Sequence, residues 1–227
     1  MISRTPALFC ALVAGFGVAA TAMAAPQTFN TALPVAQDEF VFREQFVYRK
    51  ATDDPSPADR KLQVLGGVSV LGYGVTGDVA VFGVLPYLDK ELDVTTPGGR
   101  VTRDTSGIAD ARLFGRYTVY KDDAPGRTFR IAPFIGVELP TGDDNDLGRL
   151  PAPLQLGSGS WDGFGGIVLT YQTLDYQIDA QASYTLNTEA NNVEFGDQAG
   201  LDASLQYRVW PRELDAGVPG FLYAVLE

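Results

Sequence analysis

The sequence predicts an all-β fold, an antiparallel transmembrane β-barrel of the outer-membrane type, and three observations support this prediction. Beyond residue 24, polar and apolar residues alternate with a period of two in nine segments, as they do along a half-buried strand. Most of these segments exceed the roughly 5–6 residues of a typical globular strand and reach the roughly 9–11 residues that cross a membrane. Their connections alternate in length, as the loops and turns of outer-membrane barrels do.

The chain begins with a predicted secretory signal peptide, residues 1–24, and residues 25–227 form the predicted barrel domain. An apolar run over 7–20 is followed by a small-x-small cleavage pattern at 22–24. The run is shorter than the roughly 20 residues of a spanning helix, so we expect cleavage and not a membrane anchor. The only cysteine, Cys10, leaves with this peptide. We therefore expect an exported chain without a disulfide.

Nine strands are expected, and their alternation is clearest in 174–187. There every odd-numbered residue is polar and every even-numbered residue is apolar, so one face of the strand is wholly polar. Segments 108–119 and 201–209 alternate in the same way, and the other six do so less regularly. In chain order the nine segments are 40–50, 61–73, 78–88, 108–119, 128–139, 161–171, 174–187, 201–209 and 219–226.

The connections between these segments predict which end of the barrel faces outward. The short ones are 74–77, 120–127 and 172–173, the long ones are 51–60, 89–107, 140–160 and 188–200, and 210–218 is intermediate. Outer-membrane barrels have short periplasmic turns and longer external loops. With the N-terminus in the periplasm, the first strand runs outward and all four long loops lie outside the cell.

A soluble β-sandwich is the main alternative, because its strands also have one polar and one apolar face. Its polar face would meet water and favour Lys and Glu, whereas Asp, Gln, Ser, Thr and Arg dominate here. That composition suits a wet, hydrogen-bonded lumen. No stretch in 25–227 approaches 18 consecutive apolar residues, so no helix competes with the strands to span a bilayer.

The predicted barrel is incomplete. Bacterial single-chain barrels have an even number of strands, and nine is odd. Glu227 ends the chain directly after the last strand segment, where barrels of this class usually finish with an aromatic residue. We therefore expect a C-terminal truncation and exposed edges at the first and ninth strands. The alternative is a closed eight-stranded barrel with a tail.

Composition excludes several classes of function. The chain has no His, so a Ser-His-Asp triad, a Cys-His dyad and a His-based metal site are all excluded. With 28 acidic against 17 basic residues, it lacks the basic surface of a nucleic-acid-binding protein. The acidic run 143–146 lacks the ligand order of an EF-hand and is interpreted as a solvated loop tip. We expect no enzyme activity, no catalytic residue, no cofactor and no metal.

Polar side chains within the strands are the candidate functional residues. A charge on the lipid face costs about 2–4 kcal/mol at the membrane midplane, so these residues should point into the lumen. Arg112, Arg116 and Arg130 could meet the acids of 174–187 and 201–209 across it. The predicted lumen-lining set is Asp110, Arg112, Arg116, Arg130, Glu138, Asp162, Asp175, Gln177, Asp179, Gln181, Asp202, Gln206 and Arg208. These residues could line a solute path or fill a narrow barrel as a salt-bridged plug.

Four motifs, taken in order, resemble one known family. They are Tyr73-Gly74-Val75-Thr76-Gly77-Asp78 with Leu85-Pro86-Tyr87, Ser106-Gly107-Ile108-Ala109-Asp110-Ala111 with Arg116-Tyr117, Leu139-Pro140-Thr141-Gly142-Asp143-Asp144, and Leu156-Gly157-Ser158-Gly159-Ser160-Trp161-Asp162. The chain resembles the family of the MetA pathway of phenol degradation over 60–227. The resemblance implies an outer-membrane β-barrel that handles small, aromatic molecules, and it brings no catalytic residue.

The functional hypothesis is an outer-membrane channel or transporter for small, aromatic or hydrophobic molecules. The expected partners are outer-membrane lipid, a small-molecule solute and the outer-membrane assembly machinery, with no nucleic acid. The alternative is a structural or binding barrel that transports nothing and recognises a partner through the loops 89–107 and 140–160. A soluble periplasmic β-domain is a further alternative, which membrane fractionation would separate from these two.

Overall fold

The computed structural model describes residues 30–52, 54, 56–144, 152–190, 196–211 and 221–227. The predicted signal peptide, 1–24, lies outside these residues. Within them the chain forms eleven strands and one short 3-10 helix. They are β1 (Phe40–Ala51), β2 (Lys61–Gly74), β3 (Val79–Thr96), β4 (Gly99–Ile108), β5 (Ala111–Tyr117), β6 (Tyr120–Ala124), β7 (Arg127–Leu139), η1 (Ala152–Leu154), β8 (Asp162–Thr173), β9 (Tyr176–Leu186), β10 (Gln198–Trp210) and β11 (Leu222–Leu226).

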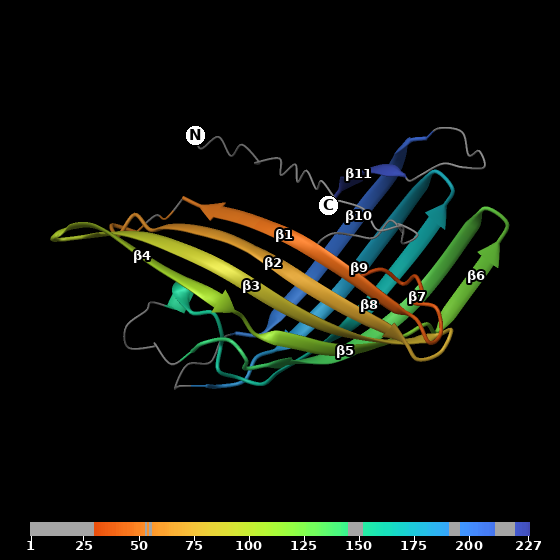
Figure 1. Ribbon diagram of the computed structural model, residues 1–227, viewed down its shortest axis with the longest axis horizontal. Helices are drawn as coiled ribbons and strands as arrows, with labels where there is room; N and C mark the ends of the chain where they lie inside the picture. Colours follow the sequence, from red (N-terminus) through yellow and green to blue (C-terminus); the bar gives the residue numbers. More distant parts are fainter. Residues whose placement is uncertain (1–29, 53, 55, 145–151, 191–195, 212–220) are drawn as a thin grey trace.

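All eleven strands belong to one antiparallel sheet that curls into a half-barrel (Figure 1). Its main path is β1-β2-β3-β5-β7-β8-β9-β10-β11, with β4 paired to β3 and β6 paired to β7. The path has nine positions, as the sequence predicts, because β4, β5 and β6 follow one another as a single interrupted strand. Among the described residues β1 pairs with β2 alone and β11 with β10 alone, so the two edges are not joined. The predicted fold class, an incomplete antiparallel β-barrel, is confirmed.

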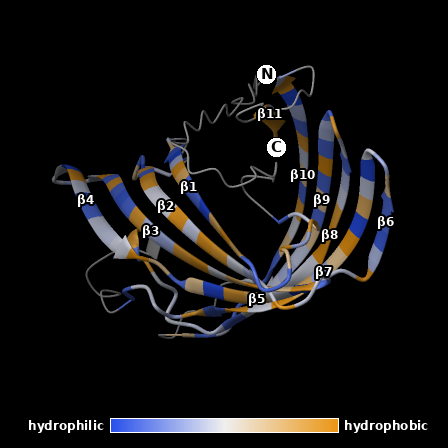
Figure 2. Ribbon diagram, turned by 45° about the vertical axis from the view of Figure 1, so that its right-hand side comes forward, coloured by the Kyte–Doolittle hydropathy of each residue, from blue (hydrophilic) through white to orange (hydrophobic). Residues whose placement is uncertain are grey.

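The two faces of the sheet show the opposite pattern of exposure to that of a soluble protein. Polar side chains are buried, and apolar side chains are exposed. In β9, Gln177 and Asp179 are 1% and 0% exposed, whereas Ile178 between them is 45% exposed. In β10, Leu201 is 87% exposed while Gln206 is fully buried. Figure 2 shows this alternation of hydrophobic and hydrophilic residues along the strands. Apolar side chains therefore cover the convex face, and polar side chains gather on the concave face.

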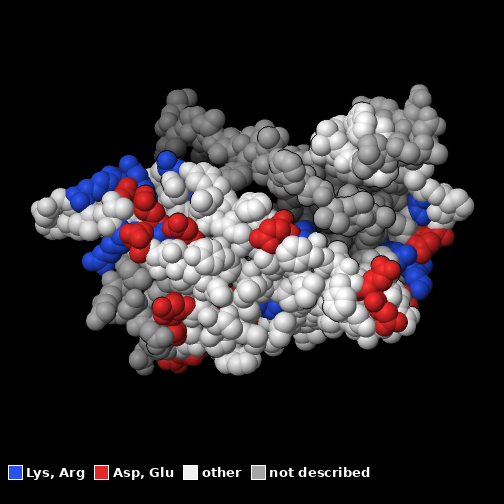
Figure 3. Space-filling model, in the orientation of Figure 1, with Lys and Arg blue, Asp and Glu red and all other residues white. Residues whose placement is uncertain are grey.

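Many charged side chains lie toward the two ends of the half-barrel, and a further acidic patch lies near the middle of the face shown in Figure 3. At one end Arg100 on the β3–β4 hairpin pairs with Asp93 and Asp59. At the other end Arg130 pairs with Asp123 and Lys121 with Asp78, close to the short turns. The convex face carries many exposed apolar side chains, as expected of a band that faces hydrocarbon. Glu44 is an exception: it lies on this face between Phe42 and Phe46 and accepts a hydrogen bond from Ser69.

One predicted loop is wrong. Segment 89–107 is the outer part of a long hairpin, in which β3 and β4 pair continuously from Tyr87–Ile108 to Thr96–Gly99. Some of its charged residues, which are typical of a solvated loop, instead make contacts across the two strands. Asp93 accepts a hydrogen bond from Thr102 at 2.5 Å and pairs with Arg100. The hairpin projects beyond the rest of the sheet (Figure 1), where water can reach both of its faces.

The remaining connections keep the predicted alternation. Short turns follow β2, β6 and β8, whereas the connections from β7 to β8 and from β9 to β10 are long. We call the two ends of the half-barrel the short-turn end and the long-loop end. In the part of the chain that the structure describes, no helix has the length and apolar character needed to cross a membrane.

Candidate functional site

A hollow of about 600 Å³ on the concave face is the candidate functional site, and we call it the inner hollow. Its walls come from β1, β2, β3, β5, β7, β8 and β9, together with Asn30 before β1 and residues 155–158 after η1. It therefore gathers residues from almost the whole length of the chain. The charged side chains that line it are Arg43, Arg49, Asp110, Arg112 and Glu138.

The strand register places several of these charges in one row across the sheet. Arg43 pairs with Val70, Val70 with Val84, Val84 with Arg112, and Arg112 with Glu138. Arg43 and Arg112 thus stand on either side of an apolar floor made by the two valines. The Arg112 Nε lies 2.5 Å from Glu138 Oε2, so this pair is a direct ion pair between neighbouring strands.

Four phenylalanine rings form an aromatic cluster on the concave face. Phe114 stacks on Phe82 with ring centroids 4.8 Å apart, and it meets Phe134 and Phe164 edge-on at 6.1 and 6.0 Å. The guanidinium of Arg112 lies 5.6 Å from the centroid of the Phe164 ring. Gly136 is required here, because a Cβ at this position would collide with Phe114 and Phe164. Phe114, Phe134 and Phe164 all line the inner hollow.

Asp110 fixes the loop that closes the long-loop end of the inner hollow. Its carboxylate accepts hydrogen bonds from Gly142 N at 2.9 Å and from Ser158 N and Oγ at 2.6 and 2.9 Å. Gly142 and Gly157 approach so closely that a Cβ on either would collide with the other. Lys90 Nζ adds a 2.5 Å bond to the carbonyl of Gln155. Residues 155–158 are thereby held against the concave face.

The residues before β1 close the short-turn end. Arg116 donates to the carbonyls of Thr31 and Leu33, and its guanidinium lies 4.8 Å from the centroid of the Phe82 ring. The Ala32 amide donates to Thr170 Oγ1 at 2.7 Å. Ala32 is completely buried in a small apolar cluster with Ala132 and Val168. We call residues 30–38 the N-terminal segment.

A fully buried polar cluster lies beside the N-terminal segment. The Asp179 carboxylate accepts hydrogen bonds from Thr170 at 2.5 Å, from Gln177 at 2.7 Å and from Gln206 at 3.1 Å. Gln177 also donates to Thr31 at 3.4 Å, which links the cluster to the segment. The Asp179 carboxylate joins these buried groups into one network, in which Gln177 Oε1 and Gln206 Oε1 are left without a hydrogen-bond partner. The network fills this end of the sheet and leaves little room for a solute.

Of the other predicted residues, Gln181 lines the inner hollow, and the rest lie outside these clusters. Arg208 pairs with Asp175 at 2.7 Å at the short-turn end. Asp162 accepts bonds from Ser160 and Thr188, and Gln181 donates to Asp202 at 3.3 Å. The prediction that Arg112, Arg116 and Arg130 meet acids of 174–187 and 201–209 is wrong. Arg112 pairs with Glu138, Arg116 binds backbone carbonyls, and Arg130 pairs with Asp123, because a partner on an adjacent strand or segment is nearer than one across the lumen.

The inner hollow is also lined from β1 by Arg43, Gln45 and Arg49, which are absent from the predicted lumen-lining set. Their odd-numbered positions on β1, alternating with the exposed Phe42, Phe46 and Tyr48, were a usable signal. The N-terminal segment carries no periodic signal, and its role depends on Arg116 far along the chain.

Part of the acidic run 143–146 lies outside the described residues. The described ranges contain no group of three or more Asp, Glu, His or Cys side chains placed to hold a metal.

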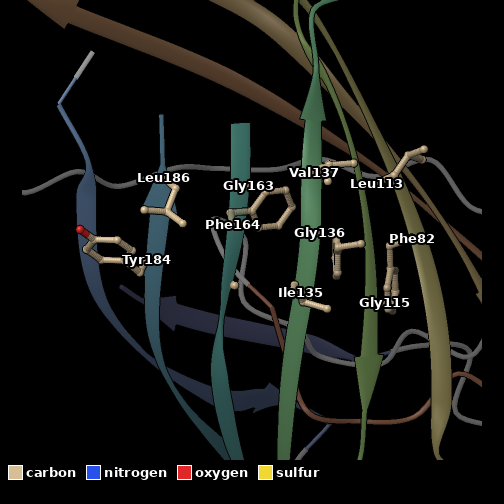
Figure 4. Close-up of a pocket in the computed structure, with 12 residues that line it drawn as sticks. Phe82, Leu113, Gly115, Ile135, Gly136, Val137, Gly163, Phe164, Tyr184 and Leu186 are labelled. Carbon is tan, nitrogen blue, oxygen red and sulfur yellow. The ribbon is translucent and has the colours of Figure 1, made fainter. Parts of the chain in front are cut away.

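A second hollow, of about 740 Å³, lies on the convex side of the same wall (Figure 4). It is lined by Leu113, Ile135 and Val137. Each of these residues is next in the sequence to a residue that lines the inner hollow. Phe114 and Phe164 contribute to both hollows. This outer hollow has no charged lining, and it belongs to the apolar band of the convex face.

The curled antiparallel sheet, with its apolar convex face and polar concave face, defines the class as a β-barrel protein. The family model described as "Putative MetA-pathway of phenol degradation" matches residues 50–226, and the chain belongs to this family. The match begins at the end of β1, so Arg43 and Arg49 precede it. Comparison with curated proteins finds no match. The fold and the family are both compatible with an outer-membrane barrel.

Proposed function

We propose that the protein is an outer-membrane β-barrel that gives small, aromatic or hydrophobic molecules a path across the outer membrane. The reversed polarity of the sheet carries this proposal. Exposed Leu201, Ile135 and Ile178 would each be unfavourable in water, and they become favourable when the convex face meets lipid. Many charged residues lie toward the two ends of the half-barrel, which also supports contact between the convex face and lipid.

The inner hollow supports the passage of small molecules. It combines phenylalanine rings with a few polar side chains, which is the usual composition of a small-molecule site. Residues 155–158 bound it at one end, and Asn30 at the other. A solute that follows the concave face would meet the loop held by Asp110, then the hollow, and then the N-terminal segment.

Vesicles containing the purified protein test this proposal. The solutes should be ones that bilayers exclude, namely benzenesulfonate, phenyltrimethylammonium and arabinose. We expect uptake of benzenesulfonate or phenyltrimethylammonium well above that of protein-free vesicles, whereas uptake of arabinose alone would contradict the proposed class of solute. Uptake of none of the three would overturn the proposal, provided that the protein co-fractionates with the outer membrane.

A structural or binding barrel is a second candidate, and the bounded ends of the inner hollow favour it. In this case the long β3–β4 hairpin, which projects from the sheet, recognises a partner. Shortening the hairpin by removing 93–102, which leaves Lys90 in place, would then abolish partner binding while assembly in the membrane continues. Unchanged partner binding after this deletion would contradict the candidate.

A further inference from the structure

We propose that the N-terminal segment is a movable gate, which closes the short-turn end of the inner hollow and opens when residues 30–33 leave the concave face. This inference rests on the proposed function and adds a means of control to it. The segment comes just before β1, and its first residue, Asn30, lines the inner hollow. Its position therefore decides whether the hollow is open at this end.

The N-terminal segment crosses the concave face of the sheet. The Asn30 amide donates to a side chain of β9 at 3.4 Å, and Ala32 contacts β8 and β7. Leu33 then accepts a hydrogen bond from β5, and Gln37 forms a bridge to the end of β2. From β2 to β9 these contacts span six of the nine positions on the main path of the sheet. A segment laid across that width obstructs any solute that follows the concave face toward the short-turn end.

The two halves of the segment are held in different ways. Residues 36–38 are tied to the end of β2 by backbone groups. The Asp38 amide donates to the Gly74 carbonyl at 2.8 Å, and a Cβ on Gly74 would collide with the carbonyl of Ala36. Residues 30–33 are held instead by side chains that project from β5, β8 and β9. The second half can therefore stay in place as a hinge while the first half leaves.

Opening replaces the contacts of the first half with contacts to water. Arg116 holds it through the carbonyls of Thr31 and Leu33, and water can replace a guanidinium at such neutral acceptors with little net loss. Within the segment only Ala32 and Leu33 are buried, so opening exposes little apolar surface. Gln177 Oε1, on a side chain that contacts Thr31, has no partner while the segment is in place, and water would satisfy it on opening.

A disulfide that fixes the segment tests the gate in vesicles. Thr31 Oγ1 and Thr170 Oγ1 lie 3.1 Å apart, so sulfur atoms at these positions are close enough to bond. Cys10, the one native cysteine, is replaced by Ser in every variant. Oxidation of Thr31→Cys/Thr170→Cys should lower the uptake of the aromatic ions about tenfold or more, because it removes the open form, and reduction should restore uptake. The control pair Asp93→Cys/Thr102→Cys, directly opposite each other on the β3–β4 hairpin, should take up the same amount oxidised and reduced.

Thiol labelling measures the opening without any transport. Ala132 is completely buried in the cluster that contains Ala32, so the single cysteine of Ala132→Cys should react slowly with a charged methanethiosulfonate. Addition of Arg116→Gln weakens the hold on the segment, and labelling should become about tenfold faster or more. The matched control is Arg127→Gln, at an exposed ion pair on the β6–β7 hairpin, which should leave the labelling rate unchanged.

Equal uptake by the oxidised and reduced forms of Thr31→Cys/Thr170→Cys would overturn the gate, as would labelling at position 132 that Arg116→Gln does not accelerate. The gate and the channel fail separately in these experiments. Accelerated labelling without uptake of any solute by any variant would reject the channel and retain the movable segment. Uptake that the disulfide leaves unchanged would retain the channel and reject the gate.

Discussion

Asp110 and Ser158 are 48 positions apart, yet the Asp110 carboxylate accepts hydrogen bonds from both the amide and the hydroxyl of Ser158. The same carboxylate accepts the amide of Gly142. Three motifs of the family resemblance, those at 106–111, 139–144 and 156–162, therefore meet at one carboxylate. Their shared role is structural, because together they hold the β7–β8 connection against the mouth of the inner hollow.

Replacing Asp110 with Asn should release this connection. The variant keeps the size of the side chain, but it replaces one acceptor oxygen with an NH₂ group. This group is itself a donor and cannot accept the hydrogen bonds of the loop. Each charge-assisted bond lost should cost about 1.5–3 kcal/mol. We expect faster limited proteolysis within 140–161, with the strands unaffected. Asp104→Asn, an exposed acid on β4, is the control. Equal proteolysis of the two variants would show that Asp110 does not hold the loop.

Replacing Arg116 with Lys should free the N-terminal segment. A lysine keeps the charge but cannot donate to the Thr31 and Leu33 carbonyls in the fork geometry of a guanidinium. We expect amide hydrogen exchange over residues 30–38 to become about tenfold faster or more. If the segment blocks the solute path, arabinose uptake should rise as well. Exchange that stays as slow as in the unmodified protein would contradict this role of Arg116.

The two faces of β10 should respond oppositely to a positive charge. Leu201→Arg places a cation on the convex face and should destabilise the membrane-inserted protein by about 2–4 kcal/mol. Asp202→Arg, one residue along on the concave face, should cost much less. Urea unfolding in lipid vesicles measures both. Similar losses for the two variants would be inconsistent with a convex face in lipid.

The turn before β2 should resist acid. Hydrogen bonds from the Arg60 side chain, and then from Ser56, hold the pKa of Asp54 well below its usual range. A lowered pKa means that these contacts persist below the ordinary Asp pKa of about 3.9 and are lost only as the pH falls further. Carboxyl titration by NMR measures this directly. The Asp54→Asn variant should lack this carboxyl titration. An Asp54 that titrates near the ordinary value of about 3.9 would refute the prediction.

Much of the fold was predictable because period-two alternation is a local property. It indicated all nine positions of the sheet path, and it put Gln177, Asp179 and Gln206 on one face. The β3–β4 hairpin was missed because Asp93 and Arg100 look like loop residues until their cross-strand partners are known. The closures of the inner hollow were missed for a similar reason. Arg116 with Thr31 and Asp110 with Ser158 depend on contacts between distant segments, which local patterns do not encode.

The two tryptophans give the most direct test of the central claim that the convex face meets lipid. Trp161 precedes β8 at the long-loop end, Trp210 ends β10 at the short-turn end, and both are exposed. Single-tryptophan variants in vesicles of brominated lipid report the depth of each ring. The account predicts strong quenching of both by bromine near the headgroups and weaker quenching by bromine near the bilayer centre. Absence of quenching at every depth would contradict it.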